Sequence, residues 1–165
     1  MGDYLMKMKR KVKKQLILLW GKVGFIVQLS QMVEYNLANI LAFDEILREF
    51  EERDSMFVIE YTEFVEKSNK WYKDLSKMPL GLILQRAKDI QFFTEESENL
   101  LSEAITKRNY IVHRLFKEDL KKSHLETDPP FYFDELETTI GLLNAINESL
   151  IRIFKQQKDE FKLIW

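Results

Sequence analysis

The chain has 165 residues, of which 45% are hydrophobic and 32% are charged, a composition typical of a folded protein rather than a disordered one. Its 5 glycines and 3 prolines are too few for the many tight turns of a β-sandwich, a barrel or a set of phosphate-binding loops. It has no cysteine, which excludes disulfides, thiolate zinc sites, iron–sulfur clusters and cysteine nucleophiles. We therefore expect one domain over residues 1–165, built from long helices with few connections.

The net charge of −2 is the difference between 25 basic and 27 acidic residues, which are unevenly distributed. Residues 7–14 hold six lysines and arginines and no acid, and such a run is an RNA-binding arm, a membrane-surface anchor or a solvated helix turn. The apolar run from Leu16 to Trp20 is shorter than the roughly 7–15 residues of a signal-peptide core. Polar residues interrupt the best candidate for a membrane span. We expect a soluble, cytoplasmic protein with no membrane partner.

The first two helices are predicted from apolar periodicity and from a helix cap. Between residues 11 and 42, apolar or small residues recur at steps of three and four, which is one face of an α-helix. Asp54 and Ser55 offer an N-cap for a second helix that runs to about Leu75. Pro79 forbids a continuing helix, and a short helical piece from Leu80 to Ile90 follows.

Two further long helices complete the predicted fold. Thr94 is a good N-cap for a third long helix, whose first turn is acidic. Pro129 and Pro130 make a second break, after which a capping box from Asp134 to Glu137 opens the last helix. The fold class predicted is all-α: an antiparallel bundle of about four long helices plus one short helix.

Most known site chemistries are missing from the sequence. The only histidines are His113 and His124, and the residues three positions before them are Tyr110 and Lys121, so neither completes a Glu-x-x-His motif. Glycine-rich phosphate loops and the Gly-x-Ser-x-Gly elbow do not occur either. We therefore expect no metal and no cofactor.

Residues 106–116 hold the one remaining candidate site. Asn109 and His113 are four residues apart and share a helix face, whereas Arg108 lies roughly 140° around the axis from His113. Arg108 and His113 meet only if the arginine uses its long side chain or if a second copy of the helix supplies the partner, so the spacing favours a homodimer. Histidine serves as acid or base near neutral pH, arginine binds phosphate oxygens, and asparagine orients its neighbours. The nearby Lys107, Arg114 and Lys117 are candidate contacts for a polyanionic substrate.

The segment Arg108-Asn109-Tyr110-Ile111-Val112-His113 resembles the Arg-x(4–6)-His signature of the HEPN superfamily, in which a polar residue often follows the arginine. HEPN proteins are commonly homodimeric, metal-independent ribonucleases, many of them toxins or phage-defence proteins. The resemblance implies a HEPN-like helical domain over 1–165 that cleaves RNA by 2′-OH attack at a dimer-interface site. Arg108 and His113 would be catalytic and Asn109 supporting, with an antitoxin or regulatory protein as a further partner.

One position departs from part of that superfamily. In HEPN toxins paired with a nucleotidyltransferase antitoxin, a tyrosine stands two residues after the histidine, where this chain has Leu115. Regulation by nucleotide modification of that tyrosine is therefore not implied. Two other functions remain open from the sequence: a catalytically silent helical module that binds a partner or RNA, and an antitoxin or immunity protein, which only the mildly acidic charge supports.

Overall fold

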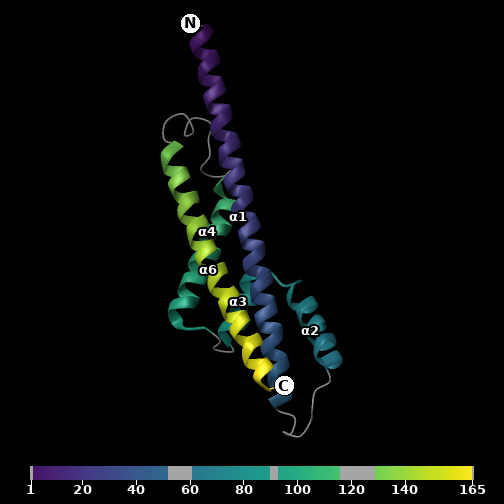
Figure 1. Cartoon of the computed structure of the whole chain (residues 1–165). Helices are drawn as coiled ribbons and strands as arrows, with labels where there is room; N and C mark the ends of the chain where they lie inside the picture. Colours follow the sequence, from purple (N-terminus) through teal and green to yellow (C-terminus); the bar gives the residue numbers. More distant parts are fainter. Residues whose placement is uncertain (1, 52–60, 90–92, 116–128, 165) are drawn as a thin grey trace. The chain divides into compact units, whose positions relative to one another are not determined.

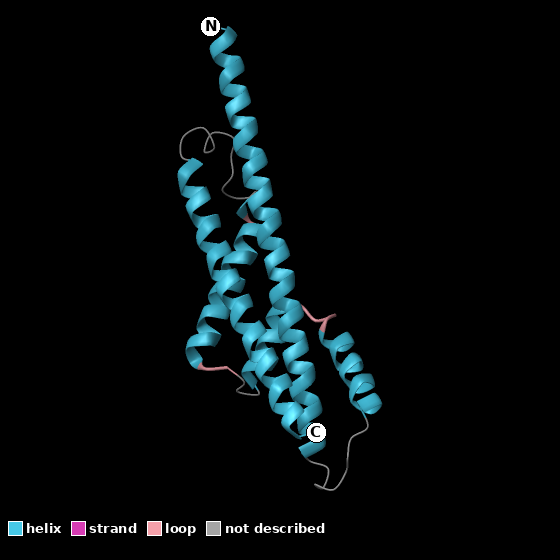
Figure 2. Cartoon of the chain, in the orientation of Figure 1, coloured by secondary structure: helices cyan, strands magenta, loops and turns pink. Residues whose placement is uncertain are grey.

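The computed structural model describes residues 2–51, 61–89, 93–115 and 129–164 (Figure 1). These residues form five helices and no strand (Figure 2). The all-α fold predicted from the sequence is confirmed. The helices are α1 (Gly2–Glu51), α2 (Tyr61–Leu75), α3 (Leu80–Asp89), α4 (Glu95–His113) and α6 (Pro129–Ile164).

Helix α1 extends beyond the apolar stripe at residues 11–42, and α6 starts earlier than predicted. The sequence leaves open whether the acidic stretch 44–54 is the end of the first helix or a separate turn. Helix α1 continues through the acidic residues after 42, where Arg48 pairs with Asp44 one turn earlier at 3.1 Å, because glutamate and arginine are good helix formers. Helix α6 begins at Pro129, five residues before the predicted start at Asp134. A proline in the first turn removes only an N–H that has no partner within the helix, so the proline pair opens α6 instead of preceding it.

The predicted breaks between α2, α3 and α4 are confirmed. Helix α2 ends at Leu75 and α3 begins at Leu80, directly after Pro79. Thr94 is the N-cap of α4, because its Oγ1 accepts a hydrogen bond from the backbone N–H of Ser97 at 3.3 Å. The predicted cap at residues 54 and 55 lies outside the described residues, as do Lys117 and His124.

The chain divides into two compact units. Unit 1 comprises residues 1–30 and 102–144, and unit 2 comprises residues 31–101 and 145–165. Helices α1, α4 and α6 each contribute residues to both units. The prediction of a single domain over 1–165 stays a prediction.

Unit 1 is held together by an apolar core between α1, α4 and α6. Figure 1 shows α4 and α6 running in opposite directions in this unit. Lys22 of α1 also forms an ion pair with Glu137 of α6. The side chains of the core are almost completely buried: Leu19, Ile26, Ile111, Leu136 and Leu143.

In unit 2, α1 and α6 run in the same direction. Asn36 Nδ2 donates to Asn147 Oδ1 at 2.6 Å, and seven residues later along both helices the rings of Phe43 and Phe154 meet edge-on with centroids 6.1 Å apart. Equal steps along two helices require a parallel pair. Phe64 of α2 packs on Phe43 at 5.3 Å and covers the same core.

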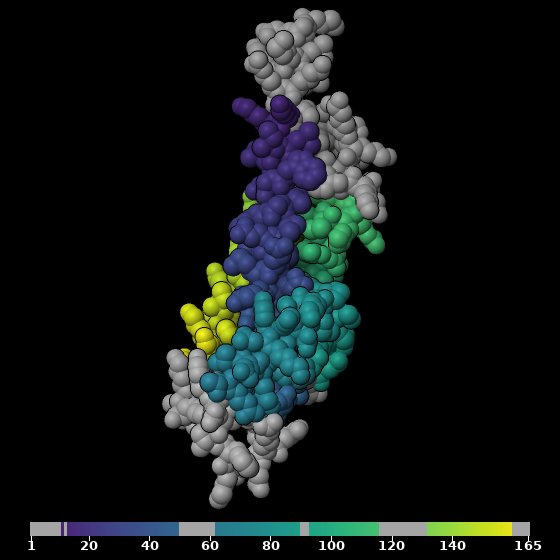
Figure 3. All heavy atoms as spheres, turned by 90° about the vertical axis from the view of Figure 1, so that its right-hand side faces the viewer, coloured from purple at the N-terminus to yellow at the C-terminus, as the bar shows by residue number. Residues whose placement is uncertain are grey.

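Helix α1 also exposes apolar side chains, and Figure 3 shows its described part, in purple and blue, at the surface. By length and composition, its stretch Lys13–Glu49 is long and apolar enough to cross a membrane, a test that the core helix of a soluble protein also meets. Leu19, Ile26 and Leu37 within that stretch are completely buried in protein, which is compatible with a soluble protein. Its exposed large apolar side chains are Ile17, Leu18, Trp20, Phe25, Met32 and Tyr35.

Candidate active site

The last two turns of α4 present the candidate residues on the side of the helix that faces away from the core of unit 1. Ile111 is completely buried and Leu115 is 3% exposed, so they fix which face of α4 points inward. His113 lies roughly 160° around the helix from Ile111, and both His113 and Asn109 are exposed. Burial of Ile111 therefore determines that the side chains of Asn109 and His113 point away from the core.

Arg108 connects the other two members of the motif. Its Nη1 donates to Asn109 Oδ1 at 2.9 Å and lies 3.5 Å from His113 Nε2. The long side chain thus bridges the roughly 140° that separates Arg108 from His113 around the helix. The three residues that the sequence singles out come together within one chain, without a second copy of the helix.

The contact between Arg108 and His113 constrains the imidazole only loosely. A guanidinium is a donor and never an acceptor, so Nε2 accepts only when the ring is neutral and carries its proton on Nδ1. A separation of 3.5 Å is at the outer limit of a hydrogen bond. The histidine is therefore oriented by Arg108 and remains available to another partner.

One nitrogen of Arg108 is left without a partner. Nε is enclosed by protein and has no hydrogen-bond partner among the residues that the structure describes. An unsatisfied buried donor costs on the order of 1–3 kcal/mol. Few buried polar groups in folded proteins lack a partner, so this nitrogen is an unusual feature of the motif.

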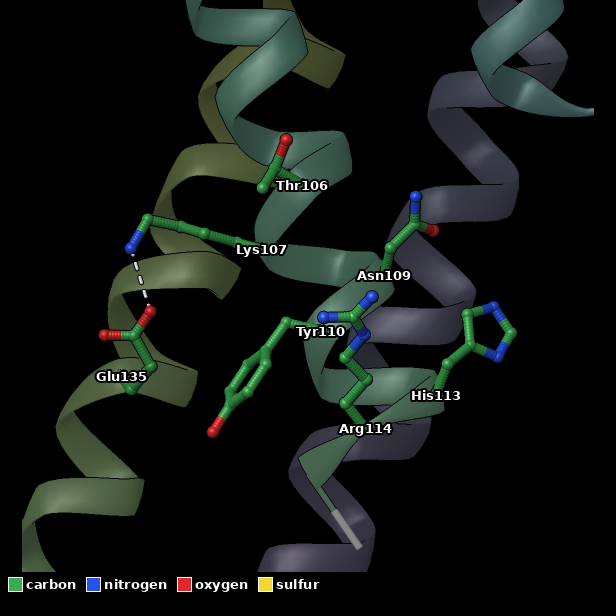
Figure 4. A pocket seen from close by; sticks show the side chains of 7 residues that line it. All are labelled: Thr106, Lys107, Asn109, Tyr110, His113, Arg114 and Glu135. Carbon is green, nitrogen blue, oxygen red and sulfur yellow. Dashed lines mark hydrogen bonds and ion pairs between the residues drawn. The ribbon is translucent and has the colours of Figure 1, made fainter. Parts of the chain in front are cut away.

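A hollow of about 780 Å³ lies beside this motif (Figure 4). In the close-up view, Asn109 and His113 point to one side of α4, while Lys107 points to the other side, toward α6. The lining residues come from α4 and the residue that follows it, and from α6: Thr106, Lys107, Asn109, Tyr110, His113, Arg114 and Glu135.

The two candidate cations that the structure describes are not equivalent. Lys107 Nζ forms an ion pair with Glu135 Oε1 at 2.8 Å, and this hydrogen bond raises the pKa of Lys107. Arg114 is exposed and makes no ion pair with the described residues. The positive charge of Lys107 is therefore already balanced by the carboxylate of Glu135. Arg114 is the better placed of the two to attract an anion.

The sequence did not identify every residue of the hollow as part of a site. Thr106 hydrogen bonds to the backbone of its own helix, at 2.9 Å from Ser102 O, so it lines the hollow without offering a free donor. Glu135 was predicted to cap the last helix, and no spacing rule could have placed it opposite Lys107 on another helix. Tyr110 belongs to the motif itself and lines the hollow.

Searches for related proteins and for a metal site give no further assignment. Within the described ranges, no group of three or more histidine, aspartate or glutamate residues is close enough to hold a metal ion. No protein-family model, curated protein or solved structure matches the chain. The candidate site therefore rests on its own residues and their geometry.

Proposed function

We propose that this protein is a metal-independent endoribonuclease of the HEPN type, acting on cytoplasmic RNA. The observation that carries the proposal is the contact of Arg108 Nη1 with Asn109 and His113, two residues that line an open hollow. This contact brings a cation that can bind phosphate beside an imidazole that can accept or donate a proton.

The proposed reaction is an internal transfer at the RNA backbone. The ribose 2′-oxygen attacks the adjacent phosphorus while the bond from phosphorus to the 5′-oxygen breaks. The products are a 2′,3′-cyclic phosphate and a free 5′-hydroxyl. His113 takes the proton from the 2′-hydroxyl as general base, which requires the neutral ring that its contact with Arg108 also requires.

Arg108 stabilises the charge that develops on the phosphate. Its guanidinium remains protonated and binds two oxygens at once, so it acts as an electrostatic group and not as a proton carrier. Asn109 holds the guanidinium in place through its Oδ1, and Arg114 attracts the substrate.

A homodimer supplies the second proton-transfer group. The leaving 5′-oxygen needs a proton, and within the described residues one copy of the chain offers one histidine at the hollow. A second copy of His113 provides the general acid if two hollows face each other. The toxin or phage-defence role, and an antitoxin or regulatory partner, rest on the resemblance of residues 108–113 alone.

The test is cleavage of single-stranded RNA by the purified full chain in EDTA, with chemical identification of the new ends. We expect cyclic phosphate ends, and a loss of at least 100-fold in rate for His113→Ala and for Arg108→Ala. Arg152→Ala and Asn99→Ala change exposed residues outside unit 1 and serve as matched controls. Undiminished cleavage by His113→Ala would rule the proposal out.

A catalytically silent RNA-binding module is the second candidate, favoured because His113 is the single histidine at the hollow in the part of the chain that the structure describes. In that case the unmodified chain binds single-stranded RNA but leaves it intact. Arg114→Ala then weakens binding, while His113→Ala has no effect. Analytical ultracentrifugation in the same buffers gives the oligomeric state for both candidates.

A further inference from the structure

A second surface of unit 1 lies on α1, distant in sequence from residues 106–114. Ile17, Leu18 and Trp20 are 61%, 59% and 58% exposed, although Leu19 between them is completely buried. Figure 3 shows this stretch of α1, in purple, at the surface on the side that faces the viewer. Three large apolar side chains within four positions of one helix are thus open to solvent, and we call residues 11–20 on this side the N-terminal face.

The N-terminal face is also strongly basic. Lys11, Lys13 and Lys14 are exposed, and no acidic residue occurs between positions 4 and 33. At about 100° per residue, each lysine shares a side of the helix with one of the exposed apolar residues three to seven positions later. Positive charges and apolar groups are therefore mixed over one half of the helix circumference.

We propose that the N-terminal face binds the surface of a membrane that contains anionic lipids, with α1 lying along the interface. Lysines attract the headgroups, and their long stems let the ammonium groups stay in the headgroup layer while Ile17 and Leu18 enter the acyl boundary. Tryptophan is enriched at that depth because its ring has an apolar body and one polar atom. This proposal goes beyond ribonuclease activity and does not depend on it.

The exposed aliphatic residues favour lipid over RNA as the partner. RNA is bound by cations and by stacking on aromatic rings, and Ile17 and Leu18 offer neither to a nucleic acid. Transfer of the same two side chains from water into the acyl region of a membrane is favourable. The expectation of no membrane partner rested on the short apolar run at Leu16–Trp20 and on the polar residues that interrupt a membrane span. Exposure of Ile17 and Leu18 changes that expectation.

The experiment is flotation of the full chain with vesicles of phosphatidylcholine, with and without phosphatidylserine. We expect the chain to float only with the anionic vesicles, and less so as salt is added. Replacing Lys11, Lys13 and Lys14 by glutamine lowers partitioning on the order of 100-fold, since each lysine near an anionic surface contributes about a fivefold factor. Ile17→Ser with Leu18→Ser abolishes flotation while the lysines remain.

Matched controls remove the same groups elsewhere. Leu82→Ser changes a residue that is 55% exposed on α3, and it leaves flotation unchanged. A triple change of exposed lysines to glutamine at Lys70, Lys73 and Lys155 lowers the net charge equally and also leaves flotation unchanged. Circular dichroism confirms that each variant retains its helical content, because every substituted side chain is exposed.

Three outcomes would overturn the proposal. The first is the absence of flotation with anionic vesicles. The second is loss of single-stranded RNA binding in the lysine variant with no change in flotation, which identifies an RNA-binding arm. The third is a fall in molecular mass for Ile17→Ser with Leu18→Ser and unchanged flotation, which identifies an interface between two copies of the chain.

Discussion

Replacement of Arg108 by lysine is expected to lower the activity of the candidate site without lowering the stability of the protein. In Arg108→Lys, a methylene takes the position of Nε, the enclosed nitrogen that has no partner within the described residues. Removing that unsatisfied donor is worth about 1–3 kcal/mol, whereas the lost hydrogen bond to Asn109 Oδ1 costs about 0.5–1.5 kcal/mol. The variant is therefore expected to be as stable as the original chain, or more stable by about 1 kcal/mol.

The same change is expected to damage the reaction. Lysine keeps the positive charge but offers one ammonium, so it cannot bind Asn109 and two phosphate oxygens together in a fixed fork. Loss of one preorganised donor to a transition state lowers kcat by about 100-fold or more. We expect this fall in kcat with little change in KM, because the charge that attracts the substrate is retained.

Two measurements on the same preparation check this prediction. Urea unfolding, followed by circular dichroism, gives the free energy of unfolding, and cleavage of a fluorescent single-stranded RNA gives kcat and KM. Arg152→Lys, at an exposed position of α6, is the control for the substitution itself and should change neither quantity. A destabilised Arg108→Lys variant with normal cleavage would refute the reasoning on both counts.

Three further predictions concern the framework of the site. Ile111→Ala removes a completely buried side chain beneath the motif and should lower the free energy of unfolding by about 2–5 kcal/mol, with Ile111→Val near 1 kcal/mol in the same urea titration. Thr94→Ala removes the N-cap of α4 and should lower the free energy of unfolding by about 0.5–2 kcal/mol, and no loss would contradict the capping role of Thr94. The ion pair with Glu135 raises the pKa of Lys107, so the charged form of the lysine stabilises the fold. This stabilisation is complete below pH 10.5, the ordinary pKa of lysine, and is lost as the pH rises through the raised pKa. Because the pair is partly exposed, the effect is at most about 1 kcal/mol, and it should disappear in Glu135→Gln when stability is measured from neutral to alkaline pH.

The helices were predictable because their signals are local. Pro79 ended one helix and Thr94 began another through backbone chemistry that involves only a few neighbouring residues. The start of α6 was not predictable from Pro129, since proline is equally at home before a helix and in its first turn. The parallel course of α1 and α6 was not predictable either, because a periodic stripe reveals which face is buried but not the direction of the helix that covers it.

The candidate site also has one part that the sequence could predict and one part that it could not. Arg108, Asn109 and His113 lie on one helix, and their spacing was enough to single them out. The spacing left open whether the arginine side chain or a second copy of the helix completes the group, and the structure brings all three together within one chain. Glu135 reaches the hollow from α6, and only the packing of two helices places it there. The exposure of Ile17 also depends on packing. An apolar residue beside a buried stripe is covered only if a neighbouring helix extends far enough to pack on it.

The parallel pairing of α1 with α6 in unit 2 has a consequence for how the chain folds. Asn36 and Asn147 are 111 residues apart in sequence, and Ile40 and Gln157 are 117 apart. Such contacts form only after α6 has been synthesised, and contacts between residues so distant in sequence slow folding. Part of the apolar surface of α1 therefore stays uncovered until α6 packs on it, and transiently exposed apolar surface of this kind promotes aggregation during folding.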